Sequence, residues 1–221
     1  MRIALLIGAL VLVLPVAAQA GIVALDDSDT WVTGGADTAA GFYPNIEMIS
    51  TIDSISNGTS VSSLATGGAG GTGASDTIGF SPSTSKGKVG TTWSTWSHSA
   101  QPHILVVYDS KLTITMCDNV GAFDFYLEPN AFQTLEMTAT ADDGTTVTQK
   151  VDGYYGAKYF GFYATGGSVI DSVTVTLKDS SIFAIGEMRI AAVPLPAAAW
   201  LGFALLGGMG VVGSIRRRLR R

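Results

Sequence analysis

The sequence is poor in the residues that usually build catalytic and metal centres. It has one cysteine, Cys117, and two histidines, His98 and His103, among 221 residues. A single cysteine excludes an internal disulfide, and after an alternating stretch its simplest role is that of a small buried hydrophobic side chain. The two histidines have no third metal ligand near them in the sequence. No nucleophile-elbow or metalloprotease motif accompanies them, so catalysis is not indicated.

Positive charge is scarce in the central part of the chain. Six of the 13 basic residues, Arg2 and five arginines at the end of the chain, lie outside it. The central part therefore contains seven basic and all 18 acidic residues, a net charge of −11. This balance excludes nucleic acid as a partner, because nucleic-acid binding needs a basic surface. It also predicts repulsion from anionic lipid or polysaccharide unless a divalent cation bridges them.

The central part of the chain also lacks a helical period. About eight short segments instead alternate apolar with polar residues or form short apolar runs, and turn residues separate them. Such segments, rich in Thr, Val and aromatics, are typical of an antiparallel β-sandwich. We therefore expect an all-β, jelly-roll-like domain over 21–191. The segments lie at 104–108, 112–116, 123–127, 135–139, 145–151, 159–163, 173–177 and 183–190.

One stretch of this domain has few large apolar side chains. Residues 56–85 are dominated by Ser, Thr, Gly and Ala. Such a composition buries little apolar surface, so we expect a mobile loop region or a weak edge strand there.

The first 20 residues have the three parts of a secretory signal peptide. Arg2 supplies a short basic region, a 12-residue apolar run follows, and Pro15 ends it. Ala18 and Ala20 then provide the small side chains of a cleavage site. We expect export through the secretion translocon and cleavage after Ala20. An uncleaved N-terminal anchor is the alternative.

The last 29 residues, 193–221, have the order expected of a membrane stop. The span 197–215 has no formal charge. As a helix it would be about 28 Å long, close to the ~30 Å hydrocarbon core of a bilayer. The basic end should stay in the cytoplasm, which predicts a single-pass inner-membrane precursor with its domain on the periplasmic side. The basic cluster comprises Arg216, Arg217, Arg218, Arg220 and Arg221.

The motif before this span resembles a known sorting signal. Val193, Pro194, Leu195, Pro196 and Ala197 match the VPLPA variant of the PEP-CTERM tail, and the apolar span and terminal arginines match its other two parts. This resemblance implies that an exosortase-type membrane protease of a Gram-negative bacterium recognises the tail. It also implies cleavage near the motif and delivery of the domain to the cell surface or extracellular matrix.

A second resemblance covers about 92–191. The stretches 121–130, 141–146, 159–163 and 183–187 are similar, in this order, to the jelly-roll domain that often precedes PEP-CTERM tails. These stretches are core strands and turns, so they bear on fold more than on function. The architecture also resembles galactose-binding-like carbohydrate modules.

Two tryptophans offer a candidate sugar contact. Trp93 and Trp96 lie in a polar, loop-like stretch that ends at His103. Exposed indole faces stack on sugar rings, and a jelly roll presents loops of this kind. The alternative is that both rings cover the sandwich core, which is the commoner position of tryptophan.

A structural calcium ion is a second candidate ligand. Carbohydrate-binding jelly rolls often hold calcium between an early segment and a carboxylate of the last strand. Asp26 and Asp27 are early acids here, and Glu187 lies in the last predicted strand. Calcium needs six to eight oxygen ligands, and no EF-hand or nonapeptide repeat supplies them, so solvated turn carboxylates are the alternative.

Together these features predict a secreted, non-enzymatic surface or matrix protein without a catalytic cofactor, whose domain binds or structures exopolysaccharide. The alternative is a carbohydrate-active enzyme with an unrecognised site. A cleft that holds two carboxylates about 5–10 Å apart would favour the enzyme. An aromatic platform without such a pair would favour the binding protein.

Overall fold

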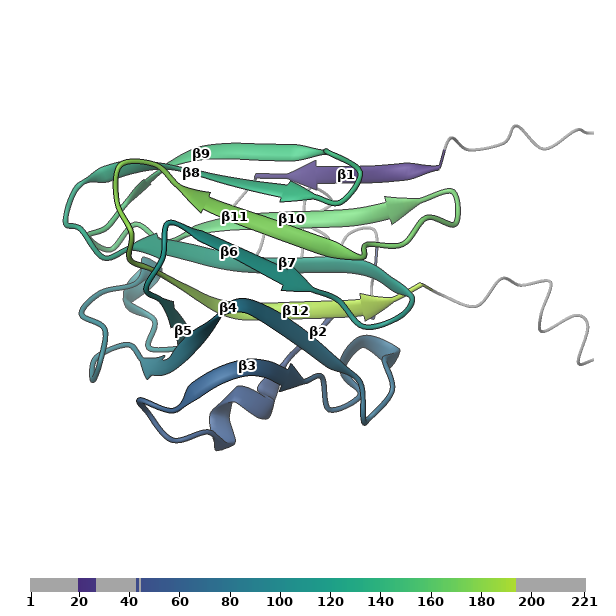
Figure 1. The fold of residues 1–221 in the computed structure, drawn as a ribbon, viewed down its shortest axis with the longest axis horizontal. Helices are drawn as coiled ribbons and strands as arrows, with labels where there is room; N and C mark the ends of the chain where they lie inside the picture. Colours follow the sequence, from purple (N-terminus) through teal and green to yellow (C-terminus); the bar gives the residue numbers. More distant parts are fainter. Residues whose placement is uncertain (1–19, 27–42, 44, 194–221) are drawn as a thin grey trace, which may run out of the picture.

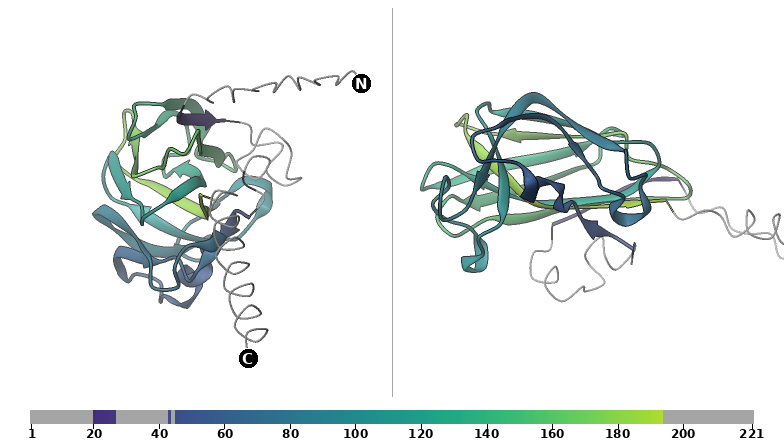
Figure 2. Two further views of the ribbon diagram at one scale, coloured as in Figure 1. Left: turned by 90° about the vertical axis from the view of Figure 1, so that its right-hand side faces the viewer. Right: turned by 90° about the horizontal axis from the view of Figure 1, so that it is seen from below.

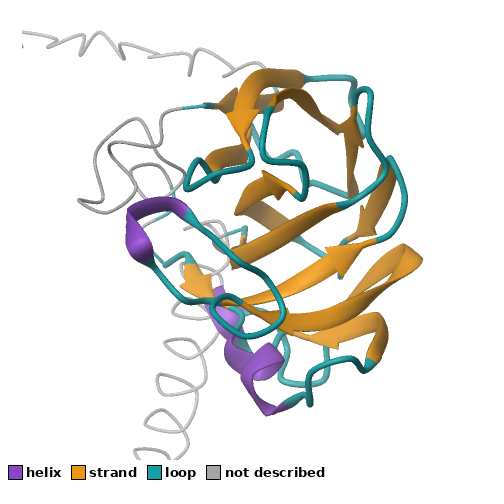
Figure 3. Cartoon of the chain, turned by 90° about the vertical axis from the view of Figure 1, so that its left-hand side faces the viewer, coloured by secondary structure: helices purple, strands orange, loops and turns teal. Residues whose placement is uncertain are grey.

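The alternating segments of the sequence form the strands of an all-β fold. The computed structural model describes residues 20–26, 43 and 45–193, and within them every paired strand runs antiparallel and no α-helix occurs (Figure 1). The strands are β1 (Gly21–Leu25), β2 (Glu47–Met48), β3 (Ser60–Ala65), β4 (Thr77–Lys88), β5 (His103–Val107), β6 (Lys111–Thr115), β7 (Val120–Pro129), β8 (Thr134–Ala141), β9 (Thr146–Asp152), β10 (Lys158–Thr165), β11 (Ser172–Leu177) and β12 (Phe183–Ala192). Three short 3₁₀ helices, η1 (Ser50–Ser54), η2 (Ala69–Gly71) and η3 (Ser97–Ser99), lie outside the sheets (Figure 3).

The strands form two layers that share one strand. The hydrogen-bonded order is β1-β10-β7-β12-β5-β4-β6-β11-β8-β9. β4 pairs with β6 through Gly79–Ser81 and with β5 through Ser85–Lys88, so it passes from one layer to the other. Pro82 lies between these two paired stretches, where its missing N–H interrupts neither ladder.

The core of the sandwich fills the space between the layers. Alternate residues of each strand point inward, so β7 contributes Phe123, Phe125 and Leu127, and β10 contributes Phe160 and Phe162. The Phe125 and Phe160 rings stack with centroids 6.0 Å apart. This burial is the main favourable contribution to folding, since each large apolar side chain adds about 1.5–3 kcal/mol.

The outer edges of the two layers are tied together by a turn. The backbone N–H of Ile22 in β1 donates to Asp143 Oδ2 at 3.0 Å, and the Thr145 hydroxyl donates to the Ile22 carbonyl at 3.2 Å. These bonds link β1 with the turn between β8 and β9, so the sandwich is nearly closed. Figure 2 (left) shows this arrangement end-on.

The prediction of a loop region over 56–85 was wrong for much of the segment. β3 lies there as an edge strand, but β4 is long and central. Its buried side chains include Ile78 and Phe80, and Thr84 and Lys86 are buried as well. The few apolar residues of this stretch are spaced so that they reach the core. The prediction missed them because it relied on the low average hydrophobicity of the stretch.

The predicted signal peptide and sorting tail lie outside the described residues. The undescribed part of the signal peptide, 1–19, includes Ala18. The undescribed part of the tail, 194–221, includes the rest of the motif, the apolar span 197–215 and the terminal arginines. Ala20 and Val193 are described, and the strands next to them, the start of β1 and the end of β12, lie at the same end of the sandwich (Figure 1). Among the described residues, no helix has the length and apolarity to cross a membrane.

Candidate functional site

The outer face of β7 is buried as thoroughly as its inner face. Every residue of β7 is buried, including Asp124 and Glu128, whose exposed fraction is 0%. The connection between β4 and β5 lays Trp93 and Trp96 over one part of this face, and Tyr43 covers another part at Ala122. A strand that alternates apolar with polar residues usually faces water on its polar side, so this cover marks the face as unusual.

Trp93 and Thr95 fix this cover to Glu128. The Trp93 indole N–H donates to Glu128 Oε2 at 2.6 Å, and the Thr95 hydroxyl donates to Oε1 at 3.2 Å. Burial raises the pKa of Glu128 to about 7, against the lowering effect of these two hydrogen bonds. Both carboxylate oxygens are therefore occupied by side chains of the covering loop.

Trp96 repeats the arrangement with a second carboxylate. Its indole N–H donates to Glu187 Oε2 at 2.8 Å, and its ring is fully buried. Glu187 has a left-handed backbone (φ 51°) at a bulge of β12, between Gly186 and Arg189. Burial raises the pKa of Glu187 above its usual value. A left-handed conformation costs about 1–2 kcal/mol for a residue other than glycine, so the surrounding contacts must hold it in place.

The second fully buried carboxylate of this face, Asp124, is paired with arginine. Arg189 binds Asp124 through two hydrogen bonds, Nε to Oδ1 at 2.9 Å and a terminal nitrogen to Oδ2 at 2.6 Å. The Tyr159 hydroxyl adds a donor at 3.2 Å. Burial raises the pKa of Asp124 to about 6, although Arg189 and Tyr159 lower it. Asp124 is thus a structural anion, with its oxygens turned to protein donors.

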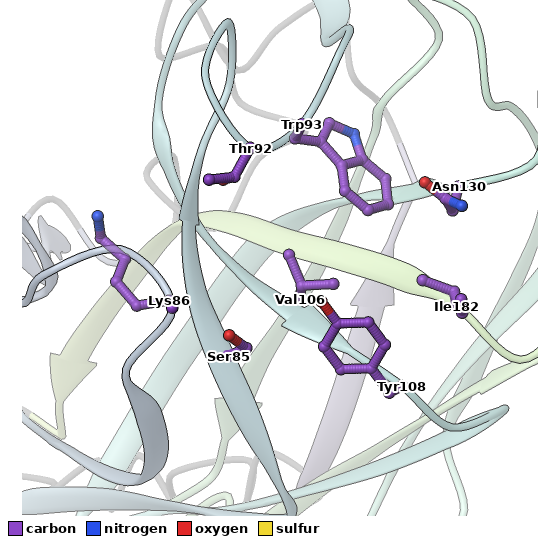
Figure 4. A pocket seen from close by; sticks show the side chains of 9 residues that line it. Ser85, Lys86, Thr92, Trp93, Val106, Tyr108, Asn130 and Ile182 are labelled. Carbon is purple, nitrogen blue, oxygen red and sulfur yellow. The ribbon is translucent and has the colours of Figure 1, made fainter.

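An open pocket lies at the end of this face. Its volume is about 310 Å³, at the lower end of the range for ligand sites. Figure 4 shows the Trp93 indole and the Tyr108 ring on opposite sides of Val106, with Asn130 and Ile182 along one side. The pocket is lined by Gly58, Ser85, Lys86, Thr92, Trp93, Val106, Tyr108, Asn130 and Ile182. We refer to it as the Trp93–Tyr108 pocket.

The chemistry of the Trp93–Tyr108 pocket is aromatic and neutral. Tyr108 is 68% exposed, so its ring is available to a ligand, whereas Trp93 is 7% exposed and forms a wall. Ser85 and Thr92 bring hydroxyls, and Asn130 brings an amide. Lys86 contributes little charge, because its ammonium group turns away and donates to Asn57 Oδ1 at 2.8 Å (Figure 4).

A second, smaller pocket of about 180 Å³ brings three titratable side chains together. Asp53, His103 and Glu187 line it together with apolar side chains of β2, η1 and β12. His103 Nδ1 lies 2.7 Å from Asp53 Oδ1. Sequence reasoning singled out His103 and Glu187 separately, but nothing in their spacing paired them.

The predicted ligand residues have different positions. Trp93 lines the larger pocket, whereas Trp96 is fully buried and has no face for a sugar ring. Glu187 is bonded to Trp96, Asp26 is exposed just after β1, and Asp27 lies outside the described residues. Within the described part of the chain, no three His, Cys, Asp or Glu side chains gather closely enough to hold a metal ion. The calcium site stays a prediction.

Sequence reasoning missed Tyr108 and Asn130. Both follow a strand directly, Tyr108 after β5 and Asn130 after β7, and both continue its outward-facing alternation. Tyr108 was part of a continuous apolar run, which indicates a buried strand. The signal that could have found it is its position next to Asp109, where the run ends in a turn.

The comparisons with known proteins identify no family. The sequence matches no protein-family model and no curated protein. One similar solved structure contains the CBM22-1-GH10 modules of a Clostridium thermocellum endo-1,4-β-D-xylanase with xylohexaose. The identity is 8% and the TM-score 0.30, over 50% of this chain and 25% of that one. Another is the family 11 carbohydrate-binding module of a Clostridium thermocellum cellulosomal cellulase, at 12% identity and a TM-score of 0.30, over 67% of this chain and 95% of that one.

A third similar structure is the enzymatically active domain of tailspike protein 4 of bacteriophage CBA120. The identity is 9% and the TM-score 0.27, over 50% of this chain and 18% of that one. This chain thus spans 25% and 18% of the lengths of the xylanase and the tailspike. Two of the three neighbours contain carbohydrate-binding modules, but similarity this weak does not extend to function.

Proposed function

We propose that this protein binds carbohydrate in the Trp93–Tyr108 pocket. The observation that carries the proposal is the exposed Tyr108 ring across Val106 from the Trp93 wall, with neutral hydroxyl and amide groups at the sides. A pyranose has an apolar face of C–H groups and a rim of hydroxyls. Aromatic rings suit the first and neutral polar side chains suit the second.

The wider setting that we propose follows the sequence. The protein is a secreted, jelly-roll-type surface or matrix component that an exosortase-type protease processes at 193–197, and its ligand is an exopolysaccharide. A signal-peptide pattern at the front and a VPLPA-type tail at the end support this setting. Binding rather than catalysis is supported by Asp124 and Glu128, because side-chain donors occupy their oxygens.

Affinity electrophoresis tests the binding proposal. The full domain, 21–193, would be run through gels that contain xylan, β-glucan, galactan or alginate. We expect retardation by at least one polysaccharide, and we expect Tyr108→Ala to weaken it by about tenfold, which is ~1.4 kcal/mol. Val23→Ala is the control, since Val23 is also exposed but lies on β1. Equal retardation of wild type and Tyr108→Ala, or none with any polymer, would overturn the proposal.

A second candidate function is glycan hydrolysis in the smaller pocket. The observation that favours it is the presence of two carboxylates, Asp53 and Glu187, in one hollow with His103. Burial raises the pKa of Glu187, as a general acid requires. Release of reducing ends from the retained polysaccharide would support it, provided that Glu187→Gln abolishes the release while gel retardation is unchanged.

A further inference from the structure

Three exposed aromatic side chains meet beside the site. Phe132 is 66%, Tyr154 58% and Tyr155 52% exposed. The Phe132 and Tyr154 rings are 5.7 Å apart, and the Tyr154 and Tyr155 rings are 4.7 Å apart, both edge to face. We refer to these three residues as the aromatic cluster. Such a group in contact with water is a common mark of an interaction site.

The backbone beneath the aromatic cluster is held firmly. The Gly153 N–H donates to the Gln133 carbonyl at 3.2 Å, which joins the β7–β8 turn to the β9–β10 turn. The two turns approach so closely that a Cβ at Gly153 would overlap the Ala131 carbonyl oxygen. The Thr95 hydroxyl also lies 3.4 Å from the Gly153 carbonyl. The aromatic cluster is therefore fixed to the loop that carries Trp93.

The backbone of the aromatic cluster is strained, and the burial of its side chains does not offset the free energy of that strain. Tyr155 has a left-handed backbone (φ 59°), which costs about 1–2 kcal/mol for a residue with a Cβ. Tyr154 precedes it in a turn where its N–H donates to Asp152 Oδ1 at 3.1 Å. All three side chains are more than half exposed, so their packing against the protein contributes little stabilisation. Strain of this kind is typical of positions that bind a ligand.

A third pocket adjoins the aromatic cluster. Its volume is about 150 Å³, and Tyr155 forms part of its wall. The other lining residues are Val89, Gly90, Ser94, Thr95, Trp96, Ser99, Ala100 and Gln101, none of them charged. Hydroxyls and an amide beside aromatic rings repeat the chemistry of the Trp93–Tyr108 pocket.

We propose that the aromatic cluster and this third pocket form a second subsite for a neutral, extended glycan. The inference rests on the proposed function, because the same chain would occupy both subsites. The same loop lines both pockets, since Thr92 and Trp93 line the first while Ser94 and Thr95 line the third. Asn130 of the first pocket is two residues before Phe132 of the aromatic cluster.

The charge of the third pocket selects the class of glycan. Its lining offers no basic group to an anionic sugar, and Asp152 lies beside Tyr154. Carboxylate repulsion would disfavour uronic acids there. A neutral polymer such as xylan or β-glucan fits this lining better than alginate.

The test compares chain lengths. Isothermal titration with neutral disaccharides and hexasaccharides would be run on wild type, Tyr108→Ala, and the double variant Tyr154→Ser/Tyr155→Ser. We expect the double variant to bind the disaccharide as wild type does and to bind the hexasaccharide about tenfold more weakly. Phe132→Ser is the second variant, because Tyr155 lies in a strained turn, and thermal unfolding would check the fold of each variant.

The outcomes separate the two proposals. Loss of hexasaccharide affinity in Tyr108→Ala but none in either cluster variant would overturn the second subsite alone. No binding of any glycan by wild type would overturn the proposed function, and the subsite with it. If wild type self-associates and the cluster variants abolish only that association, the aromatic cluster is a protein interface and the subsite is refuted.

Discussion

The Trp93 indole nitrogen lies 2.6 Å from a carboxylate oxygen of Glu128, a residue 35 positions further along the chain. Trp96 and Glu187, 91 positions apart, form the same kind of pair. Each bond joins a carboxyl group, buried at Glu128 and partly buried at Glu187, to the loop that walls the candidate sugar sites. The loop is thus held to β7 and β12 by indole–carboxyl hydrogen bonds, which gain charge assistance where the carboxyl is ionised.

Stability should fall as the pH rises through the range in which Glu128 titrates. Its pKa is about 7 in the folded chain against an ordinary value of 4.5, so the folded state holds a proton that the unfolded chain releases. The contribution is fully present below about pH 4.5 and lost above about pH 7, a difference of ~3 kcal/mol. Asp124 and Glu187 act in the same direction. Urea unfolding between pH 4.5 and 8 measures the slope.

The variant Glu128→Gln should reduce this slope. Its amide oxygen can accept from Trp93, and its NH₂ group can donate to the Thr95 hydroxyl, so the contacts survive without titration. At pH 8 we expect this variant to be more stable than wild type. Asp118→Asn is the control, since Asp118 is exposed. An unchanged slope in Glu128→Gln would show that Glu128 stays ionised in the fold.

Breaking the Asp124–Arg189 pair from one side should be costly. Arg189→Met removes the cation from a fully buried carboxylate and leaves the Tyr159 hydrogen bond in place. Loss of one partner of a buried pair typically costs about 3–5 kcal/mol. The pKa of Asp124 should rise further, so the loss should be larger at pH 8 than at pH 5. The double variant Asp124→Leu/Arg189→Met should lose less than the two single losses combined. Additive losses in urea unfolding would argue against coupling.

The strands were predictable because their signal is local. From β5 to β12, each strand turns alternate residues into one core, and this period is visible in segments such as Leu112–Met116 and Val173–Leu177. β4 was missed because its period is interrupted by Ser, Gly and Pro82. Its place between β5 and β6 depends on pairing across the fold, which local composition does not report.

The candidate site was predictable only in part, for the same reason. The predicted sugar contact lies on the loop that carries Trp93 and Trp96, and Trp93 lines a pocket there. Their acceptors, Glu128 and Glu187, lie in other strands, and no spacing rule connects them. The aromatic cluster likewise joins two turns, whose residues Phe132 and Tyr154 are 22 positions apart in the sequence. Only the folded arrangement of β7 to β10 brings them together.

Gly153→Ala should loosen the aromatic cluster. A methyl group there would meet the Ala131 and Pro129 carbonyl oxygens, so the two turns must separate. We expect a loss of more than ~1 kcal/mol in thermal unfolding, the range of overpacked sites. Gly79→Ala is the matched control, because its new Cβ would meet only Thr115 at an ordinary 3.7 Å. Equal melting temperatures for the two variants would contradict the close approach at Gly153.

Cys117 should react slowly with thiol reagents. It packs against the main core and is half-buried, and burial together with Asp76 and Asp118 raises its pKa above the usual value. Because the thiolate is the reactive form, the folded protein should react more slowly than glutathione at pH 8. Unfolding in urea should restore the rate. Equal rates for folded and unfolded protein would place the thiol in open solvent.

Processing of the tail should depend on the two prolines after the last strand. β12 ends at Ala192, and the Val193 N–H still donates to the Asn119 carbonyl at 2.8 Å, so the predicted motif begins where the domain ends. A protease that reads 193–197 would meet the motif directly beside a folded body, without a linker on that side. Pro194→Ala/Pro196→Ala should therefore leave the precursor membrane-retained with its terminal arginines, as mass spectrometry of the C-terminus would detect. A short Gly-Ser linker inserted after Val193 should not restore processing of this variant. The linker improves the protease's access to the motif, whereas the variant lacks the prolines that the protease recognises. Release of the double variant as efficient as that of wild type would refute recognition through the prolines.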